Sequence, residues 1–125
     1  MTGDRMDRSF LLIGALAGFT GVALGAFAAH GLRGRLSPEM LAVFETGVRY
    51  HVYHALALIA TAAIMERFGG RLVAAAGWLF TAGIVLFSGS LYLLAFTGIT
   101  IFGAITPMGG VAFLLGWACL AFAAI

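Results

Sequence analysis

The sequence carries very little charge and contains no lysine. Only 10% of its 125 residues are charged and 62% are hydrophobic, whereas soluble domains carry about 25% charged residues. The few charges are also unevenly placed, because none occurs from Leu72 to Ile125. A soluble chain this short needs polar residues to cover its surface. The missing charge therefore excludes a soluble domain and predicts an integral membrane protein whose main partner is the lipid bilayer.

Cysteine and basic clusters are scarce as well. The single cysteine, Cys119, lies deep in an apolar segment, so we interpret it as a small buried hydrophobe with no internal disulfide partner. The net charge of +2 comes from scattered arginines, of which only Arg33 and Arg35 form a close pair. Such weak basicity does not indicate a nucleic-acid surface. We therefore expect no nucleic-acid partner.

Four segments are apolar and long enough to cross a bilayer, which takes roughly 20 helical residues. The predicted spans are about residues 9–29, 38–67, 72–97 and 108–125. Together they predict an all-α, integral membrane four-helix bundle that forms a single domain over residues 1–125. The second helix differs from the others because its first half is amphipathic and polar.

Short sequence motifs mark where some of these spans begin and end. Ser37-Pro38-Glu39 combines a hydroxyl cap, a proline and an acid, which is typical of a helix start. Gly69-Gly70 is expected to end the same helix. Residues 98–107 are apolar but contain two glycines and Pro107. We expect them to form a loop, with Pro107 opening the last helix, because proline fits the first turn.

The first span has an alternative interpretation as a cleaved secretory signal peptide. A positive head, an apolar run and the segment Ala26-Phe27-Ala28 fit that pattern. The apolar run of about 20 residues is longer than the usual roughly 7–15 residues, and it is rich in glycine. We therefore expect this segment to remain as a membrane span.

Arginines are more numerous on the side that holds both termini. With four spans, that side carries Arg5, Arg8, Arg67 and Arg71, and the other side carries Arg33 and Arg35, with Arg49 near its edge. Positive charge favours the cytoplasmic side. We therefore predict a multi-pass protein of the cytoplasmic (inner) membrane with both termini in the cytoplasm.

Small residues recur on one face of the first span. They are Gly14, Gly18, Gly21, Gly25 and Ala29, separated by steps of three or four residues. In lipid, helices associate largely through close backbone contact at such positions. The stripe predicts a helix-packing surface, used by the chain's own helices, by a second copy or by a larger membrane complex. A looser series with similar steps in the third span comprises Gly77, Thr81, Ser88 and Tyr92.

Polar side chains concentrate where the first span ends and the second begins. The candidate cluster comprises His30, Glu45, Arg49, Tyr50, His51, Tyr53 and His54. Glu45 and Arg49 stand one turn apart in the order that favours an ion pair. Ionisable groups in a membrane are costly and suggest function. The same residues are also suited to anchoring helix depth at the interface.

Several chemical interpretations of this cluster stay open. Two histidines from different helices could ligate haem, and His51 and His54 could share a metal with His30 or Glu45. A proton or ion pathway, and a quinone or lipid-headgroup pocket framed by Arg49 and the tyrosines, are further alternatives. An enzyme acting on lipid would need a water-reachable base, for which His51 and His54 are the candidates.

No nucleophile–base arrangement, phosphate loop or metal signature is present in the sequence. We therefore predict that the protein is not an enzyme and binds no cofactor or metal. The favoured function is that of a helix-packing accessory subunit or a homo-oligomer. The alternative is a small transporter or ligand-binding membrane protein that uses Arg49 and His54.

Four motifs, taken in order, resemble one family of membrane proteins. They are Gly25–Leu32, Phe44–Leu58, Phe87–Tyr92 and Ile105–Gly110. They resemble the YgdD-like family, also called domain of unknown function 423, of small bacterial inner-membrane proteins with a related mitochondrial branch. The resemblance implies four transmembrane helices and no assigned activity, and it favours a shared site near His30, Arg49 and His54. The first motif departs from the family in having Phe27-Ala28 where Gly-Ala is more usual, which leaves less room for close backbone approach.

Overall fold

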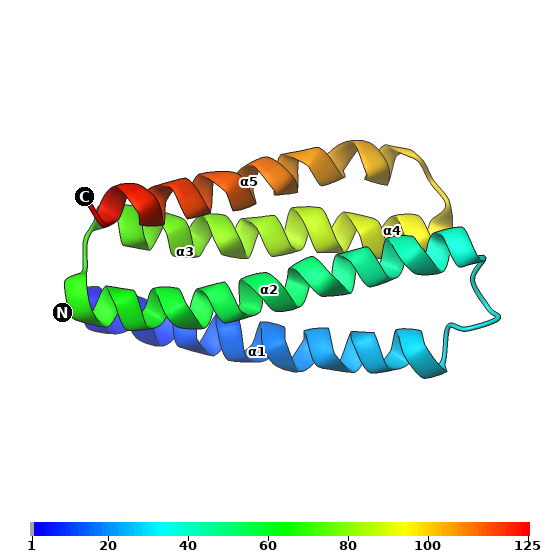
Figure 1. Ribbon diagram of the computed structural model, residues 1–125, viewed down its shortest axis with the longest axis horizontal. Helices are drawn as coiled ribbons and strands as arrows, with labels where there is room; N and C mark the ends of the chain where they lie inside the picture. The colour runs from blue at the N-terminus through cyan, green and yellow to red at the C-terminus, as the bar shows by residue number, and fades with distance from the viewer. Residues whose placement is uncertain (1) are drawn as a thin grey trace.

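The computed structural model describes the backbone of residues 2–125 and the side chains from Arg5 onward. Its elements are α1 (Thr2–His30), α2 (Pro38–Phe68), α3 (Arg71–Gly83), the π-helical turn η1 (Ile84–Ser88), α4 (Gly89–Thr97) and α5 (Ile101–Ala123). Because α3, η1 and α4 continue one another, they form a single rod (Figure 1). The described residues thus contain four helical rods that are long and apolar enough to cross a membrane. The predicted all-α, four-helix membrane fold is confirmed.

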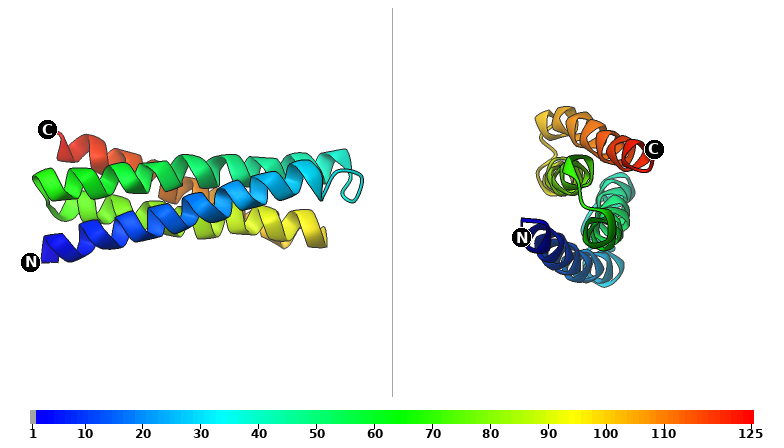
Figure 2. Two further views of the ribbon diagram at one scale, coloured as in Figure 1. Left: turned by 90° about the horizontal axis from the view of Figure 1, so that it is seen from below. Right: turned by 90° about the vertical axis from the view of Figure 1, so that its left-hand side faces the viewer.

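The central pair of rods is α2 and α3–η1–α4, and the two remaining rods flank it (Figure 2). α1 packs along α2, and α5 packs along α3–η1–α4. Consistent with this order, 44% of the apolar part of α2 is buried, against 22% for α1 and for α5. Both termini lie at the end of the molecule that also holds the α2–α3 turn (Figure 1). The α1–α2 and α4–α5 loops lie at the opposite end.

Both ends of α2 lie where the sequence predicted them. At its start, the Ser37 hydroxyl oxygen accepts a hydrogen bond from the backbone N–H of Met40 at 3.2 Å, and Pro38 occupies the first turn. At its end, Gly69 has a φ of +67° and donates its N–H to the Met65 carbonyl at 2.9 Å. A positive φ at this position suits glycine because it has no Cβ.

The start of α5 differs from the prediction. The helix begins at Ile101, so Pro107 lies inside it rather than at its first turn. Proline weakens the interior of a helix because it cannot donate the backbone hydrogen bond. Here the neighbouring Thr106 contacts the Ser90 hydroxyl of α4 at 2.6 Å and a backbone carbonyl one turn earlier at 3.2 Å. This tertiary contact fixes the early turns of α5, which local preference alone disfavours.

Phenylalanine rings cover glycines where neighbouring rods meet. The pairs are Phe10 over Gly77, Phe80 over Gly116 and Phe113 over Gly83. A Cβ at Gly116 would lie 2.6 Å from the Phe80 ring, and the other two glycines leave still less space. Phe10 and Phe80 are fully buried as a result. Because lipid tails are as apolar as the core, such close packing is a main source of helix association.

The π-helical turn brings α5 and α2 close to the third rod. In η1, Gly89 donates its N–H to the Ile84 carbonyl, one residue further than in an α-helix. Gly109 of α5 approaches this turn so closely that a Cβ there would overlap the Phe87 backbone. On the other side, the Ser88 hydroxyl donates to the Gly47 carbonyl of α2 at 2.7 Å.

Replacement of Gly109 by alanine should destabilise the protein, because the added methyl group would overlap Phe87 backbone atoms that cannot rotate away. Overpacking of this kind costs about 1–3 kcal/mol. Gly110→Ala is the matched control, since its Cβ would lie at an ordinary 3.9 Å from the Phe87 ring. Unfolding in mild detergent, followed by circular dichroism, measures both variants. Equal stability of the two would contradict the close approach.

Candidate functional site

The predicted polar cluster is divided between the inside and the outside of the bundle. His51 and His54 are buried, with 7% and 4% of their surface exposed. The exposed members are His30, Glu45, Arg49, Tyr50 and Tyr53. The division follows from helix geometry: at 100° per residue His51 and His54 lie about 60° apart on the inner face, whereas Glu45, Arg49 and Tyr53 follow one another on the outer face.

His51 joins three helices through its two ring nitrogens. Its Nδ1 lies 2.8 Å from the Tyr92 hydroxyl of α4, and its Nε2 lies 3.2 Å from the Thr20 hydroxyl of α1. The Thr20 hydroxyl proton is already directed to the α1 backbone, at 3.0 Å from the Leu16 carbonyl. The consistent assignment is therefore that Nε2–H donates to Thr20, while Nδ1 accepts from Tyr92. The ring is neutral in this arrangement.

His54, about 60° around the same helix from His51, joins α2 to α5. Its Nδ1 lies 2.8 Å from the Tyr50 carbonyl, which can only accept, so Nδ1 carries the proton. Its Nε2 accepts the indole N–H of Trp117 at 3.1 Å. The imidazole also stacks on Phe113, with centroids 3.5 Å apart and planes within 8°. Position, tautomer and ring plane are thus all fixed by neighbours.

These hydrogen bonds limit the chemistry that the histidines can perform. A neutral imidazole has one nitrogen lone pair, and in both rings it already accepts a hydrogen bond, from Tyr92 for His51 and from Trp117 for His54. Neither ring therefore offers a lone pair to a metal, a haem iron or a substrate proton. Among the described residues, no group of three or more His, Cys, Asp and Glu side chains could hold a metal ion.

The charged pair lies on the outer surface of α2. Both Glu45 and Arg49 are exposed, and the side chains described here include no ion pair between them, so the expected pairing is not formed. The depth of Arg49 follows from α1, where a Cβ on Gly25 would lie 3.2 Å from Val48 and one on Gly21 would lie 2.8 Å from Val52. Arg49 is therefore level with the apolar run of α1, inside the predicted hydrocarbon region.

The small-residue stripe of α1 faces α2. Added Cβ atoms at Gly14, Gly21 and Gly25 would lie 2.9, 2.8 and 3.2 Å from α2 side chains, and one at Gly18 would lie 4.0 Å from Ala55. Ala29, at the end of the series, is exposed. In this structure the four glycines therefore pack inside the chain's own bundle.

A groove of about 410 Å³ opens between α2 and α5. Its walls include Tyr50, His54, Phe113, Pro107 and Trp117. Two polar groups in its lining, the His54 imidazole and the Trp117 indole N–H, are already bonded to each other. What the groove presents is consequently an aromatic and apolar surface that suits a lipid chain.

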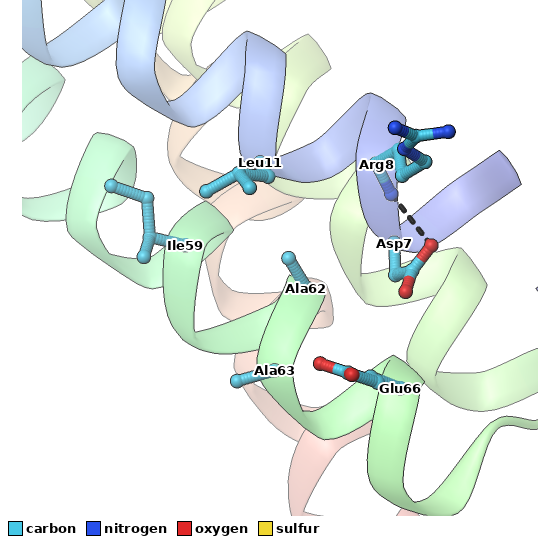
Figure 3. Close-up of a pocket in the computed structure, with 7 residues that line it drawn as sticks. All are labelled: Asp7, Arg8, Leu11, Ile59, Ala62, Ala63 and Glu66. Carbon is cyan, nitrogen blue, oxygen red and sulfur yellow. Dashed lines mark hydrogen bonds between the residues drawn. The ribbon is translucent and has the colours of Figure 1, made fainter. Parts of the chain in front are cut away.

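A smaller hollow of about 200 Å³ lies between α1 and α2 at the end that holds the termini (Figure 3). Its lining residues are Asp7, Arg8, Leu11, Ile59, Ala62, Ala63 and Glu66. One Asp7 oxygen accepts the backbone N–H of Arg8 at 2.7 Å, and Glu66 approaches from α2. The hollow lies where the apolar spans end, so its charges form the polar rim of the membrane region.

Sequence reasoning did not identify the partners of the two histidines as site residues. Tyr92 had a weak signal, because it follows helical steps along the third span after Gly77, Thr81 and Ser88. Trp117 lies in the middle of its span, away from the interfacial position where tryptophan is enriched. Thr20 had no signal beyond being a hydroxyl among glycines and apolar residues.

Four membrane-length rods with a hydrogen-bonded interior define a small polytopic integral membrane protein. The chain belongs to the DUF423 family, because the family model "Protein of unknown function (DUF423)" matches residues 24–110. It is 51% identical over 117 residues to the UPF0382 membrane protein YwdK of Bacillus subtilis, covering 93% of this chain and 95% of that protein. It is 45% identical over 119 residues to a UPF0382 membrane protein of Haemophilus influenzae, covering 94% of each. No solved structure matches the chain.

Replacement of Tyr92 by phenylalanine should destabilise the bundle, because His51 Nδ1 would lose its hydrogen-bond donor. Interhelical hydrogen bonds in membrane proteins contribute about 0.6 kcal/mol on average and up to about 1.7 kcal/mol. Tyr53→Phe is the control, since Tyr53 is exposed on the outer face. Thermal unfolding in mild detergent compares the two variants, and a control that lost as much stability as Tyr92→Phe would argue against the assigned network.

Proposed function

We propose that this membrane protein acts through contacts between helices, as an accessory subunit of a larger membrane complex or as a homo-oligomer. The observation that carries the proposal is the exposed charged pair Glu45 and Arg49 on α2. Charge facing lipid is costly, and Arg49 lies about one turn inside the end of the apolar run of α1. Contact with another protein removes that cost.

The interior of the bundle supports the same proposal. Its histidines, which are the residues best suited to proton chemistry, bond to Thr20, Tyr92 and Trp117. A transport pathway would instead need polar groups that follow one another through the bundle. Here Arg49 and His54 face different directions, which disfavours the transporter alternative.

We also propose that the protein resides in the cytoplasmic membrane with both termini in the cytoplasm. Arg5 and Arg8 begin α1, and Arg67 and Arg71 flank the α2–α3 turn, so these four arginines gather at the end that holds the termini (Figure 1). The α1–α2 loop at the other end carries two arginines. This asymmetry supports the proposed orientation under the positive-inside rule.

Purification in mild detergent tests the helix-contact proposal. Two copies of the chain with different tags are expressed together, one is captured, and the eluate is examined for the second copy and for other membrane proteins. We expect either the second copy or another membrane protein to be recovered in a stoichiometric amount with the captured copy. As a control, the two tagged copies are expressed in separate cells and their membranes are mixed before detergent is added. Co-capture from this mixture would report exchange of copies in detergent. Recovery of a monomer alone would contradict the proposal.

Cysteine labelling tests the orientation. In a Cys119→Ser background, Gly34→Cys should react with an impermeant maleimide in intact cells, because Gly34 is exposed in the turn between α1 and α2. Its φ of +80° strains any residue with a side chain, but that strain falls on the turn and not on a membrane-spanning helix. Gly3→Cys should react only after the membrane is opened. Labelling of position 3 from outside would reverse the proposed orientation.

A further inference from the structure

The outward face of α2 carries a continuous series of exposed residues. Six of them, Ala42, Glu45, Arg49, Tyr53, Leu56 and Ala60, define the outer α2 stripe. Their steps of three or four residues keep them on one side of the helix. The stripe therefore runs along the membrane-spanning part of α2, and no other helix in the described part of the chain covers it.

The outer faces of the flanking helices are different. α1 exposes Leu12, Leu16 and Phe19, and α5 exposes Val111 and Leu114. These are side chains that lipid tails solvate well. Among the described residues, the outer α2 stripe is unlike these faces because it places opposite formal charges at or inside the edge of the apolar region.

We propose that a second copy of this chain docks on the outer α2 stripe, with Glu45 of each copy paired to Arg49 of the other. This inference rests on the proposed function and specifies its partner. Two copies in one membrane share their orientation, so a two-fold axis along the membrane normal sets the two α2 helices parallel. The stripe is self-complementary under this symmetry, because each copy supplies one acid and one base.

The spacing of the two charges fits such a pair. Glu45 and Arg49 are one turn apart, which is about 6 Å along the helix axis. Long side chains bridge similar offsets between parallel helices in coiled coils. Ala42 and Ala60, before and after the charges, carry only a methyl group, so no large side chain at either end of the stripe holds the two helices apart.

The charge pattern favours a second copy over a phospholipid headgroup. A phosphate would neutralise Arg49, but it would also bring negative charge next to the carboxylate of Glu45, one turn away. A second copy neutralises both residues at once. The symmetric contact therefore leaves no uncompensated charge on the stripe.

Disulfide crosslinking in native membranes tests the interface. In a Cys119→Ser background, Leu56→Cys should give an oxidised dimer in high yield. Phe19→Cys is the matched control, because Phe19 is 75% exposed on α1 and its neighbour Gly18 lies against Ala55, next to Leu56. We expect no dimer from the control. A dimer from Phe19→Cys without one from Leu56→Cys would overturn this interface while leaving the proposed function intact.

Charge exchange tests the reciprocal pairing. In the Leu56→Cys background, Glu45→Arg and Arg49→Glu should each lower the dimer yield about tenfold, which corresponds to about 1.4 kcal/mol. The double exchange E45R/R49E should restore it, and this rescue separates repulsion from misfolding. Loss of the dimer without rescue would overturn the pairing. Absence of any dimer, together with release of bound phospholipid by Arg49→Glu, would assign the stripe to lipid instead.

Discussion

Hydrogen bonding of two buried histidines is the constraint on which the rest of this structure depends. The hydrocarbon region supplies no water, so each imidazole nitrogen must find its partner within the protein. Thr20 of α1 and Tyr92 of α4 serve His51, and Trp117 of α5 serves His54. These contacts connect α2 to all three other rods and fix its rotation and depth against them.

The glycines next to His51 follow from this constraint. For His51 to reach Thr20, α1 must approach closely, and a Cβ on Gly21 would lie only 3.3 Å from the imidazole ring. For the Tyr92 hydroxyl to reach the same ring, its aromatic ring must lie over Gly47, where a Cβ would be 2.8 Å away. Close packing and polar pairing therefore require each other here, since a larger residue at either glycine would separate the hydrogen-bonded groups.

Composition and short patterns were sufficient to predict the rods and the ends of α2, because lipid solubility, capping and glycine breaks are local properties of the chain. The interior network could not be predicted in the same way. The side-chain partners of His51 and His54 are separated from them by 31 to 63 residues, and periodicity within one helix carries no information on such pairs. The early start of α5 escaped prediction for the same reason, because the contact between Thr106 and Ser90 is tertiary.

The polar residues on the inner face of α2 have hydrogen-bond partners within the chain, whereas the charged residues on its outer face have none among the described side chains. This difference indicates which face is available for function. On the inner face, a change of partner at His51 or His54 would break the contacts that fix the bundle, so these residues are poorly suited to a catalytic or transport cycle. On the outer face, Glu45 and Arg49 have no such structural role within the described part of the chain, and the bilayer is an unfavourable environment for them. Exposed charges that bond to no described side chain and are costly in lipid support the proposed contact with another molecule, and their opposite signs suit a partner that carries both signs.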